Sequence, residues 1–188
     1  RTVDEQLARG EGRALSALVP LGLLYHITGD QKYGQACRNA TLEASFGVYA
    51  CLGAYGYDLA YDLMTPDERR RCEEKMLAFI RQKYRWRARF IQCVGLWGSG
   101  LEDDEVAATL SKLHAWLLEH RKYLESWAAE RGGDGNSHGY IGQHEYVGTM
   151  GALQAWRAAT GQDLFKGMIW VRGMAAYYLY HILPGTSH

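Results

Sequence analysis

The stretch LYHITGDQKY, residues 24–33, contains the end of one helix and the start of the next. Gly29 is the residue type that ends helices in a left-handed conformation, and Asp30 is a preferred N-cap for a helix beginning at Gln31. The stretch WRAATGQDLF, residues 156–165, repeats the order of a ring, Thr-Gly, a polar pair and a second ring. One helix–turn–helix device used twice predicts a stacked or circular array of helix pairs.

Outward from these two turns, the apolar residues recur with helical spacing. After residue 101, four leucines share one stripe, with Trp116 and Trp127 beside it; they are Leu110, Leu113, Leu117 and Leu124. The run from Thr65 to Glu68 combines an N-cap, a proline at the first helical position and a glutamate at the third. The connections are short, so neighbouring helices are expected to be antiparallel.

The sequence therefore predicts an all-α fold of antiparallel helix pairs. We expect seven helices, at about 3–28, 31–45, 48–64, 66–91, 101–131, 140–160 and 162–183. Pro20 should kink or divide the first of them. We expect residues 1–188 to form a single helical domain that is a fragment of a longer multi-domain protein.

Composition narrows the classes of partner. Apolar residues make up 47% of the 188 residues and charged residues 22%, which is typical of a soluble globular protein. Lys plus Arg and Asp plus Glu both total 21, so charge gives no reason to expect nucleic acid or an anionic membrane as partner. The four cysteines show no zinc spacing and are expected to be buried thiols.

The most unusual stretch is the glycine-rich GGDGNSHGY of residues 132–140, followed by QHEY at 143–146. It brings together an amide at Asn136, an imidazole at His138 and a phenol at Tyr140, with His144 and Glu145 close behind. Glycines let a loop adopt many conformations, and loops that gather such side chains often carry function. The alternative is a glycine-rich connector whose polar residues are incidental.

Three elements together resemble the helical domain of heparinase II/III-type and related alginate lyases. They are residues 24–33, the stretch YDLAYDLMTPDER at 57–69, and the Asn-x-His of Asn136 and His138. Their order and approximate spacing agree with that family over nearly the whole chain. The resemblance implies part of an (α/α) toroid, followed in the full protein by a β-sandwich domain, and a periplasmic or secreted location.

The resemblance also implies β-elimination on a uronic-acid-containing polysaccharide. Asn136 and His138 would neutralise the uronate carboxylate, which makes the C5 proton easier to remove. A tyrosine or histidine would act as base and then as acid toward the leaving oxygen. Tyr140, His144 and Glu145 complete the candidate catalytic set, although the family's catalytic tyrosine falls close to or beyond the end of this chain. No cofactor is expected.

The same loop also matches the spacing of an EF-hand calcium loop. Asp134, Asn136, His138, Gly139 and Glu145 fall at the first, third, fifth, sixth and twelfth positions. Histidine is a poor ligand for Ca²⁺, which prefers oxygen, and the chain has no second such loop. Calcium is therefore the alternative, and no metal is the prediction.

A second candidate element is the basic stretch RQKYRWRARF of residues 81–90. On one continuous helix, Arg81, Arg85 and Arg89 would share a face. Arg85 and Arg89 could then hold uronate carboxylates, with Trp86 as a stacking surface for sugar. The same stripe could contact nucleic-acid phosphates, or it could be a solvated basic face near a helix end.

Three function classes follow from these residues. The first is a polysaccharide lyase acting on acidic polysaccharide, with no nucleic acid or membrane as partner. The second is a glycoside hydrolase on the same helical toroid, for which Asp58 and Asp62 are a carboxylate pair four residues apart. We expect that pair to be hydrogen-bonded packing instead, because buried carboxylates usually have partners. The third is a non-catalytic helical module that binds sugar or another partner.

Overall fold

The computed structural model describes residues 17–44, 46, 50–82, 85–131 and 148–171, and these residues are helices and short connections with no strand. The all-α prediction is confirmed for this part of the chain. The helices are α2 (Leu18–Thr28), α3 (Gln31–Glu43), α4 (Ala50–Leu59), the 3-10 turn η3 (Tyr61–Leu63), α5 (Pro66–Ile80), α6 (Trp86–Leu96), α7 (Asp103–Arg131) and α9 (Gly151–Thr160).

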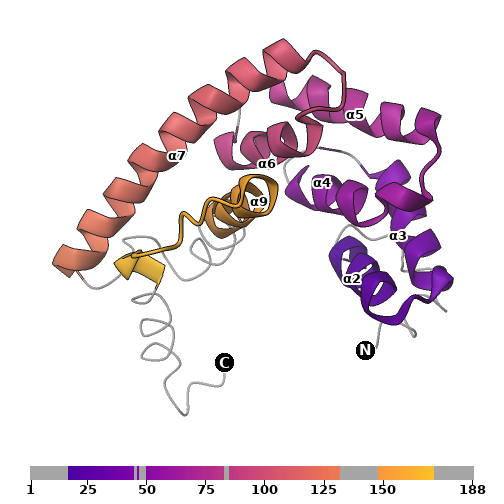
Figure 1. Cartoon of the computed structure of the whole chain (residues 1–188), viewed down its shortest axis with the longest axis horizontal. Coiled ribbons are helices and arrows are strands. Elements are labelled where there is room, and N and C mark those ends of the chain that lie inside the picture. The colour runs from indigo at the N-terminus through magenta and orange to yellow at the C-terminus, as the bar shows by residue number, and fades with distance from the viewer. Residues whose placement is uncertain (1–16, 45, 47–49, 83–84, 132–147, 172–188) are drawn as a thin grey trace, which may run out of the picture. The chain divides into compact units, whose positions relative to one another are not determined.

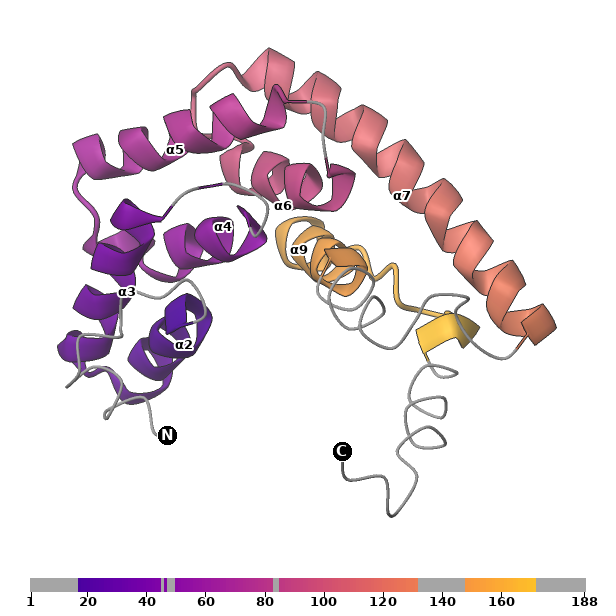
Figure 2. The ribbon, with the colours of Figure 1, turned by 180° about the vertical axis from the view of Figure 1, so that it is seen from behind.

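The chain divides into two compact units, Arg1–Leu110 and Ser111–His188, and the boundary falls inside α7. The prediction of one helical domain is not tested by this division. In the first unit, α2 packs against α4 and α4 against α6, while α3 and α5 pack on this row and on each other. Figures 1 and 2 show the same two rows from opposite sides.

Several helix boundaries differ from the prediction. The helix expected over 66–91 is two helices, because α5 ends at Ile80 and α6 begins at Trp86. Pro20 lies in the first turn of α2, where a missing N–H costs little because that group has no partner within the helix. The last helix was expected from 162, but a turn occupies 164–167 and the helix starts at Ile169.

The start of α5 is fixed by the predicted capping box. The Thr65 hydroxyl accepts from the Glu68 amide at 3.3 Å, and the Glu68 carboxylate accepts from the Thr65 amide at 2.9 Å. Arg38 on α3 forms an ion pair with the same carboxylate. These contacts with Thr65 and Arg38 hold the pKa of the Glu68 carboxyl below its ordinary value. One glutamate thus caps α5 and ties it to α3.

Close packing of α2, α3 and α4 depends on small residues. A Cβ on Gly22 of α2 would lie 2.6 Å from the Leu59 Cβ of α4, so the two helices approach to a distance that only glycine permits.

Between α4 and α5, the buried Tyr57 hydroxyl donates to the Glu73 carboxylate at 2.7 Å. Burial and this bond raise the pKa of Tyr57 far above its ordinary value.

The predicted core positions are largely confirmed. The four leucines of the α7 stripe are all buried, while Trp116 beside them is 53% exposed. Cys37, Cys72 and Cys93 are buried free thiols, and burial raises their pKa to about 11, 11 and 12. The structure does not describe the side chain of Cys51. Within the described residues, no helix is long and apolar enough to cross a membrane.

The repeated turn has the same hydrogen bonds in both units. Gly29 and Gly161 are left-handed C-caps, with φ of 71° and 74°. The Thr28 and Thr160 hydroxyls donate to the carbonyls four residues earlier, at 2.6 and 2.7 Å. Each hydroxyl also accepts from the amide two residues later, at 3.2 Å in both turns. The sequence repeat is therefore a repeat of local structure.

That local repeat ends after the cap. In the first turn, Asp30 accepts from the Lys32 amide at 3.0 Å and α3 begins at once. In the second, Asp163 accepts from the Phe165 amide at 2.9 Å, one residue later relative to the glycine, and a turn follows. The extra residue delays the next helix.

Candidate functional site

The predicted catalytic loop lies outside the described residues. This covers all five candidate catalytic residues, Asn136, His138, Tyr140, His144 and Glu145, and the calcium alternative of Asp134–Glu145. Their roles stay predictions. Before the loop comes the end of α7, and after it a π-helical turn at 148–150 leads into α9. The end of α7 and the π-helical turn both belong to the second unit, so the packing of that unit holds the residues on either side of the loop.

Three contacts hold α7 to the later segments of this unit. The His114 ring on α7 stacks on the Trp156 ring of α9, with centroids 4.1 Å apart and planes 21° apart. Arg121 donates to the Lys166 carbonyl at 3.1 Å. Glu125 accepts from the amides of Ile169 and Trp170 at 2.8 and 3.1 Å, which caps the start of the next helix.

His114 is half-buried and has the electrostatics of a neutral imidazole. Its Nε2 is buried and has no hydrogen-bond partner among the described residues. Burial lowers the pKa of His114 below its ordinary value of 6.5, because the charged form would lose hydration. The stack with Trp156 therefore favours the neutral ring. His114 thus packs α7 against α9 through its ring.

The basic stretch around Arg85 does not form the expected stripe. Because α5 and α6 are separate helices, Arg81, Arg85 and Arg89 do not lie on one helix face. Arg81 makes a two-bonded ion pair with Glu105, at 3.0 and 2.6 Å. Arg89 donates through Nε to the Ile80 carbonyl at 2.7 Å and so caps the end of α5. Two of the three arginines thus serve the fold.

Arg85 and Trp86 occupy the start of α6. Arg85 is the N-cap and has φ of 49° and ψ of 73°, the left-handed region, which costs energy for a residue with a Cβ. Trp86 is half-buried, and the guanidinium of Arg87 lies 4.8 Å from the centroid of its ring. Substrate binding by Arg85, Trp86 and Arg89 stays a prediction.

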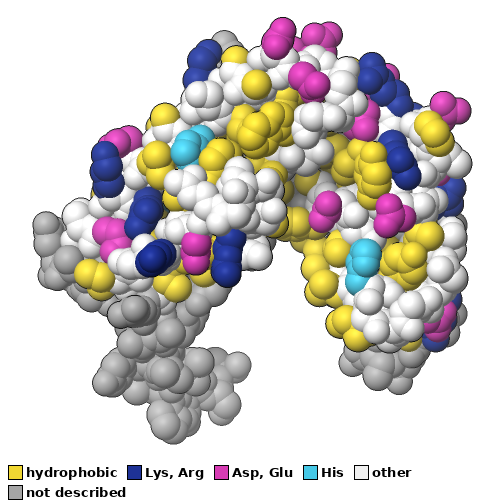
Figure 3. Space-filling view, viewed as in Figure 1, with side chains coloured by type: hydrophobic (Ala, Val, Ile, Leu, Met, Phe, Trp, Pro, Cys, Tyr) yellow, Lys and Arg dark blue, Asp and Glu magenta, His cyan; other side chains and the backbone are white. Residues whose placement is uncertain are grey.

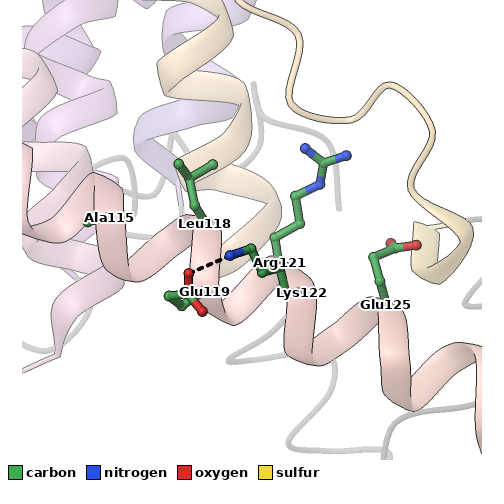
Figure 4. Close-up of a pocket in the computed structure, with 6 residues that line it drawn as sticks. All are labelled: Ala115, Leu118, Glu119, Arg121, Lys122 and Glu125. Carbon is green, nitrogen blue, oxygen red and sulfur yellow. Dashed lines mark hydrogen bonds and ion pairs between the residues drawn. The ribbon is translucent and has the colours of Figure 1, made fainter.

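A pocket of about 580 Å³ lies along one flank of α7 (Figure 4). The ion pair between Lys122 and Glu119, at 2.7 Å, forms part of its lining. Arg121 and Glu125, which also line it, are engaged with the backbone of 166–170. These contacts of the charged lining groups are structural, so the pocket is a poor candidate for an anion or sugar.

The other flank of α7 carries a row of aromatic rings. Trp116 and His120 are nearly parallel, with an interplanar angle of 8° and centroids 6.3 Å apart. His120 and Tyr123 follow at 22° and 6.1 Å. Trp116 is 53% exposed and Tyr123 54%. The two outer rings of the row are therefore exposed, and His120 between them is partly exposed.

The carboxylate pair considered for hydrolysis is not packed. Asp58 and Asp62 are both exposed, so the expectation of a buried, hydrogen-bonded role is wrong. The two residues do not share one α-helix, because α4 ends at Leu59 and a 3-10 turn follows at 61–63. Within the described residues, no group of three or more histidine, cysteine or acidic side chains could hold a metal ion.

Surface charge has no strong bias in the view of Figure 3. Basic and acidic side chains are interspersed over the described part of that face. This mixture matches the equal totals of basic and acidic residues in the sequence.

Comparison with known proteins gives no match: no family model, no curated protein and no solved structure is similar to this chain.

Sequence reasoning missed the aromatic row. The sequence analysis places Trp116 beside the leucine stripe and does not connect it with His120 or Tyr123. Their spacing to Tyr123, of four and then three residues, is the signal that would have found the row, because such residues are neighbours on a helix.

Proposed function

We propose that this chain is the helical part of a polysaccharide lyase that cleaves uronic-acid-containing chains by β-elimination. The observation that supports this most is the two-row packing of the first unit, with α2, α4 and α6 in one row and α3 and α5 in the other. An (α/α) toroid would continue two such rows of antiparallel helices. The turn repeated at Gly29 and Gly161 is the connection that such an array would reuse.

The reaction would break two bonds without water. A base takes the C5 proton of the uronate, a double bond forms between C4 and C5, and the C4–O bond to the next sugar breaks. The leaving oxygen then takes up a proton. The Asn136 amide and the His138 ring would bind the carboxylate and stabilise the negative charge that develops beside C5.

The remaining loop residues have supporting roles in the proposal. Tyr140 and His144 are the phenol and imidazole nearest to the Asn-x-His element, and either has the chemistry of a general base. Glu145 would orient a histidine ring by accepting its second N–H. In the first unit, Arg85 and Trp86 are proposed to contact uronate carboxylates and sugar rings.

The proposal is tested by following ultraviolet absorbance while the full-length protein is incubated with alginate, heparan sulfate, chondroitin and hyaluronan. A C4–C5 double bond conjugated to the carboxylate absorbs, so a rise is expected on at least one of these. We expect His138→Ala to lower the initial rate by at least about a hundredfold. His181→Ala is the matched control and should keep the wild-type rate.

Two outcomes would contradict the proposal. An unchanged rate in His138→Ala would show that His138 and its loop do not take part in the reaction. New reducing ends without any rise in absorbance would favour the hydrolase interpretation.

A further inference from the structure

Four residues of α7 line up along one flank of the helix in the second unit. Lys112, Trp116, His120 and Tyr123 are spaced by four, four and three residues, so each lies about one turn beyond the last. This flank is distinct from the one that carries the pocket and from the stripe that carries the buried leucines.

The rings of the row are parallel but not in close contact. The His114 and Trp156 rings, which do stack closely, have centroids 4.1 Å apart. The rings of the row are nearly parallel, with centroids 6.3 and 6.1 Å apart. The two outer rings also keep solvent-accessible surface, since Trp116 is 53% exposed and Tyr123 54%.

The row has the dimensions of a short piece of polysaccharide. Trp116 and Tyr123 are seven residues apart, which is about 10 Å along a helix. That separation matches a disaccharide unit in an extended chain, so alternate sugar rings could stack on the two exposed rings.

The charges along the row favour an anionic ligand. Lys112 is exposed and lies one turn before Trp116. The carboxylate of Glu119, which lies between Trp116 and Tyr123 in the sequence, forms an ion pair with Lys122 at 2.7 Å. The acid is therefore already partnered, and the ammonium of Lys112 remains at the end of the row for a carboxylate of the ligand.

We propose that Lys112, Trp116, His120 and Tyr123 form a binding surface for an acidic polysaccharide, separate from the catalytic loop. Sugar rings stack on Trp116 and Tyr123, and a uronate carboxylate pairs with Lys112. The surface would retain a long chain on the protein between cleavage events. The choice of a uronate polymer rests on the proposed function, while the binding itself does not use the loop.

The test is isothermal titration of the full-length protein with a short 4-linked oligouronate and with a neutral 4-linked glucan oligosaccharide. All variants carry His138→Ala, which prevents turnover and weakens binding at the loop. We expect Trp116→Ala and Tyr123→Ala each to weaken oligouronate binding by about tenfold or more. Lys112→Gln should weaken binding of the oligouronate but not of the neutral oligosaccharide.

Trp97→Ala is the matched control, because Trp97 is 52% exposed and follows α6 in the first unit. It should bind like the parent, and all variants should keep its helical circular dichroism. Unchanged affinity in both Trp116→Ala and Tyr123→Ala would overturn the inference. So would self-association that disappears in Trp116→Ala while no sugar binds, since a second copy would then be the occupant.

The two proposals fail separately. If the row variants lose binding but the wild type shows no elimination, the binding surface is supported and the lyase proposal is rejected. If elimination depends on His138 but binding is unchanged in the row variants, the lyase proposal is supported and the binding surface is rejected.

Discussion

Gly22 shows how one small residue sets the distance between helices. The Cβ that any other residue would add lies 2.6 Å from the Leu59 Cβ, and that atom is fixed by the backbone of α4. Gly95 on α6 is the opposite case, because its added Cβ would meet only the Met76 sulfur at 3.8 Å, an ordinary contact. The two glycines therefore have different reasons to be present.

We predict opposite effects for alanine at these two positions. Gly22→Ala should lower the free energy of unfolding by about 1–3 kcal/mol, because α2 and α4 must move apart. Gly95→Ala should leave it unchanged or raise it by up to about 1 kcal/mol, because alanine favours the helix. Urea unfolding followed by circular dichroism measures both. Equal effects would show that α2 and α4 do not approach as described.

Local signals at single residues were predictable from the sequence, and so was the burial of apolar residues, but the exposure of the polar residues Asp58 and Asp62 was not. Thr65, Gly29 and Gly161 cap helices as expected, because a cap depends on residues within one turn. Asp58 and Asp62 were expected to be buried and are exposed. Their burial depends on which helix faces them, and spacing along one helix does not contain that information.

At the scale of elements, α7 has a different function on each side. Its leucine stripe is buried, and its Arg121 and Glu125 fix the chain at 166–170. His114 contacts α9 through the stack with Trp156. Since α7 and α9 flank the predicted catalytic loop, the quality of this packing should decide where the loop side chains lie.

His114 makes the packing of α9 dependent on pH. Its folded-state pKa is lowered, so the unfolded chain takes up a proton at a higher pH than the folded chain does. The contribution of His114 to stability should therefore be complete above pH 6.5, fall as the pH drops toward the folded-state value, and then level off.

The measurement is the free energy of unfolding of the wild type minus that of His114→Phe, as a function of pH. Phenylalanine keeps a ring for Trp156 and does not titrate, and the subtraction removes the other histidines. The difference should decrease on acidification below pH 6.5. A difference that stays flat would refute the neutral ring.

The break between α5 and α6 was missed for a reason at this scale. Residues 81–85 contain no glycine or proline, so the sequence shows one continuous helical pattern. The helix ends because tertiary contacts replace its own hydrogen bonds: Arg89 caps the Ile80 carbonyl, and Arg81 pairs with Glu105. Arg85 then takes the left-handed conformation that starts α6.

For the whole molecule, the sequence was sufficient for the fold class but not for the division into units. The boundary between Leu110 and Ser111 has no linker, because it lies within α7. Of the candidate site, Trp86 lies on a helix as expected, Arg85 is the N-cap of α6 and not a mid-helix residue, and the aromatic row was missed. The loop of Asn136 and His138 stays a prediction made from residue types and resemblance.

The central claim is that the protein cleaves by elimination, and the mass of the new chain end tests it most directly. Elimination consumes no water, so the products from a uronate polymer should include unsaturated ends one water lighter than hydrolysis products. Mass spectrometry of the products from the full-length protein, with His138→Ala as reference, should show these ends in the wild type only. Saturated ends carrying the mass of an added water would contradict the account and identify a hydrolase.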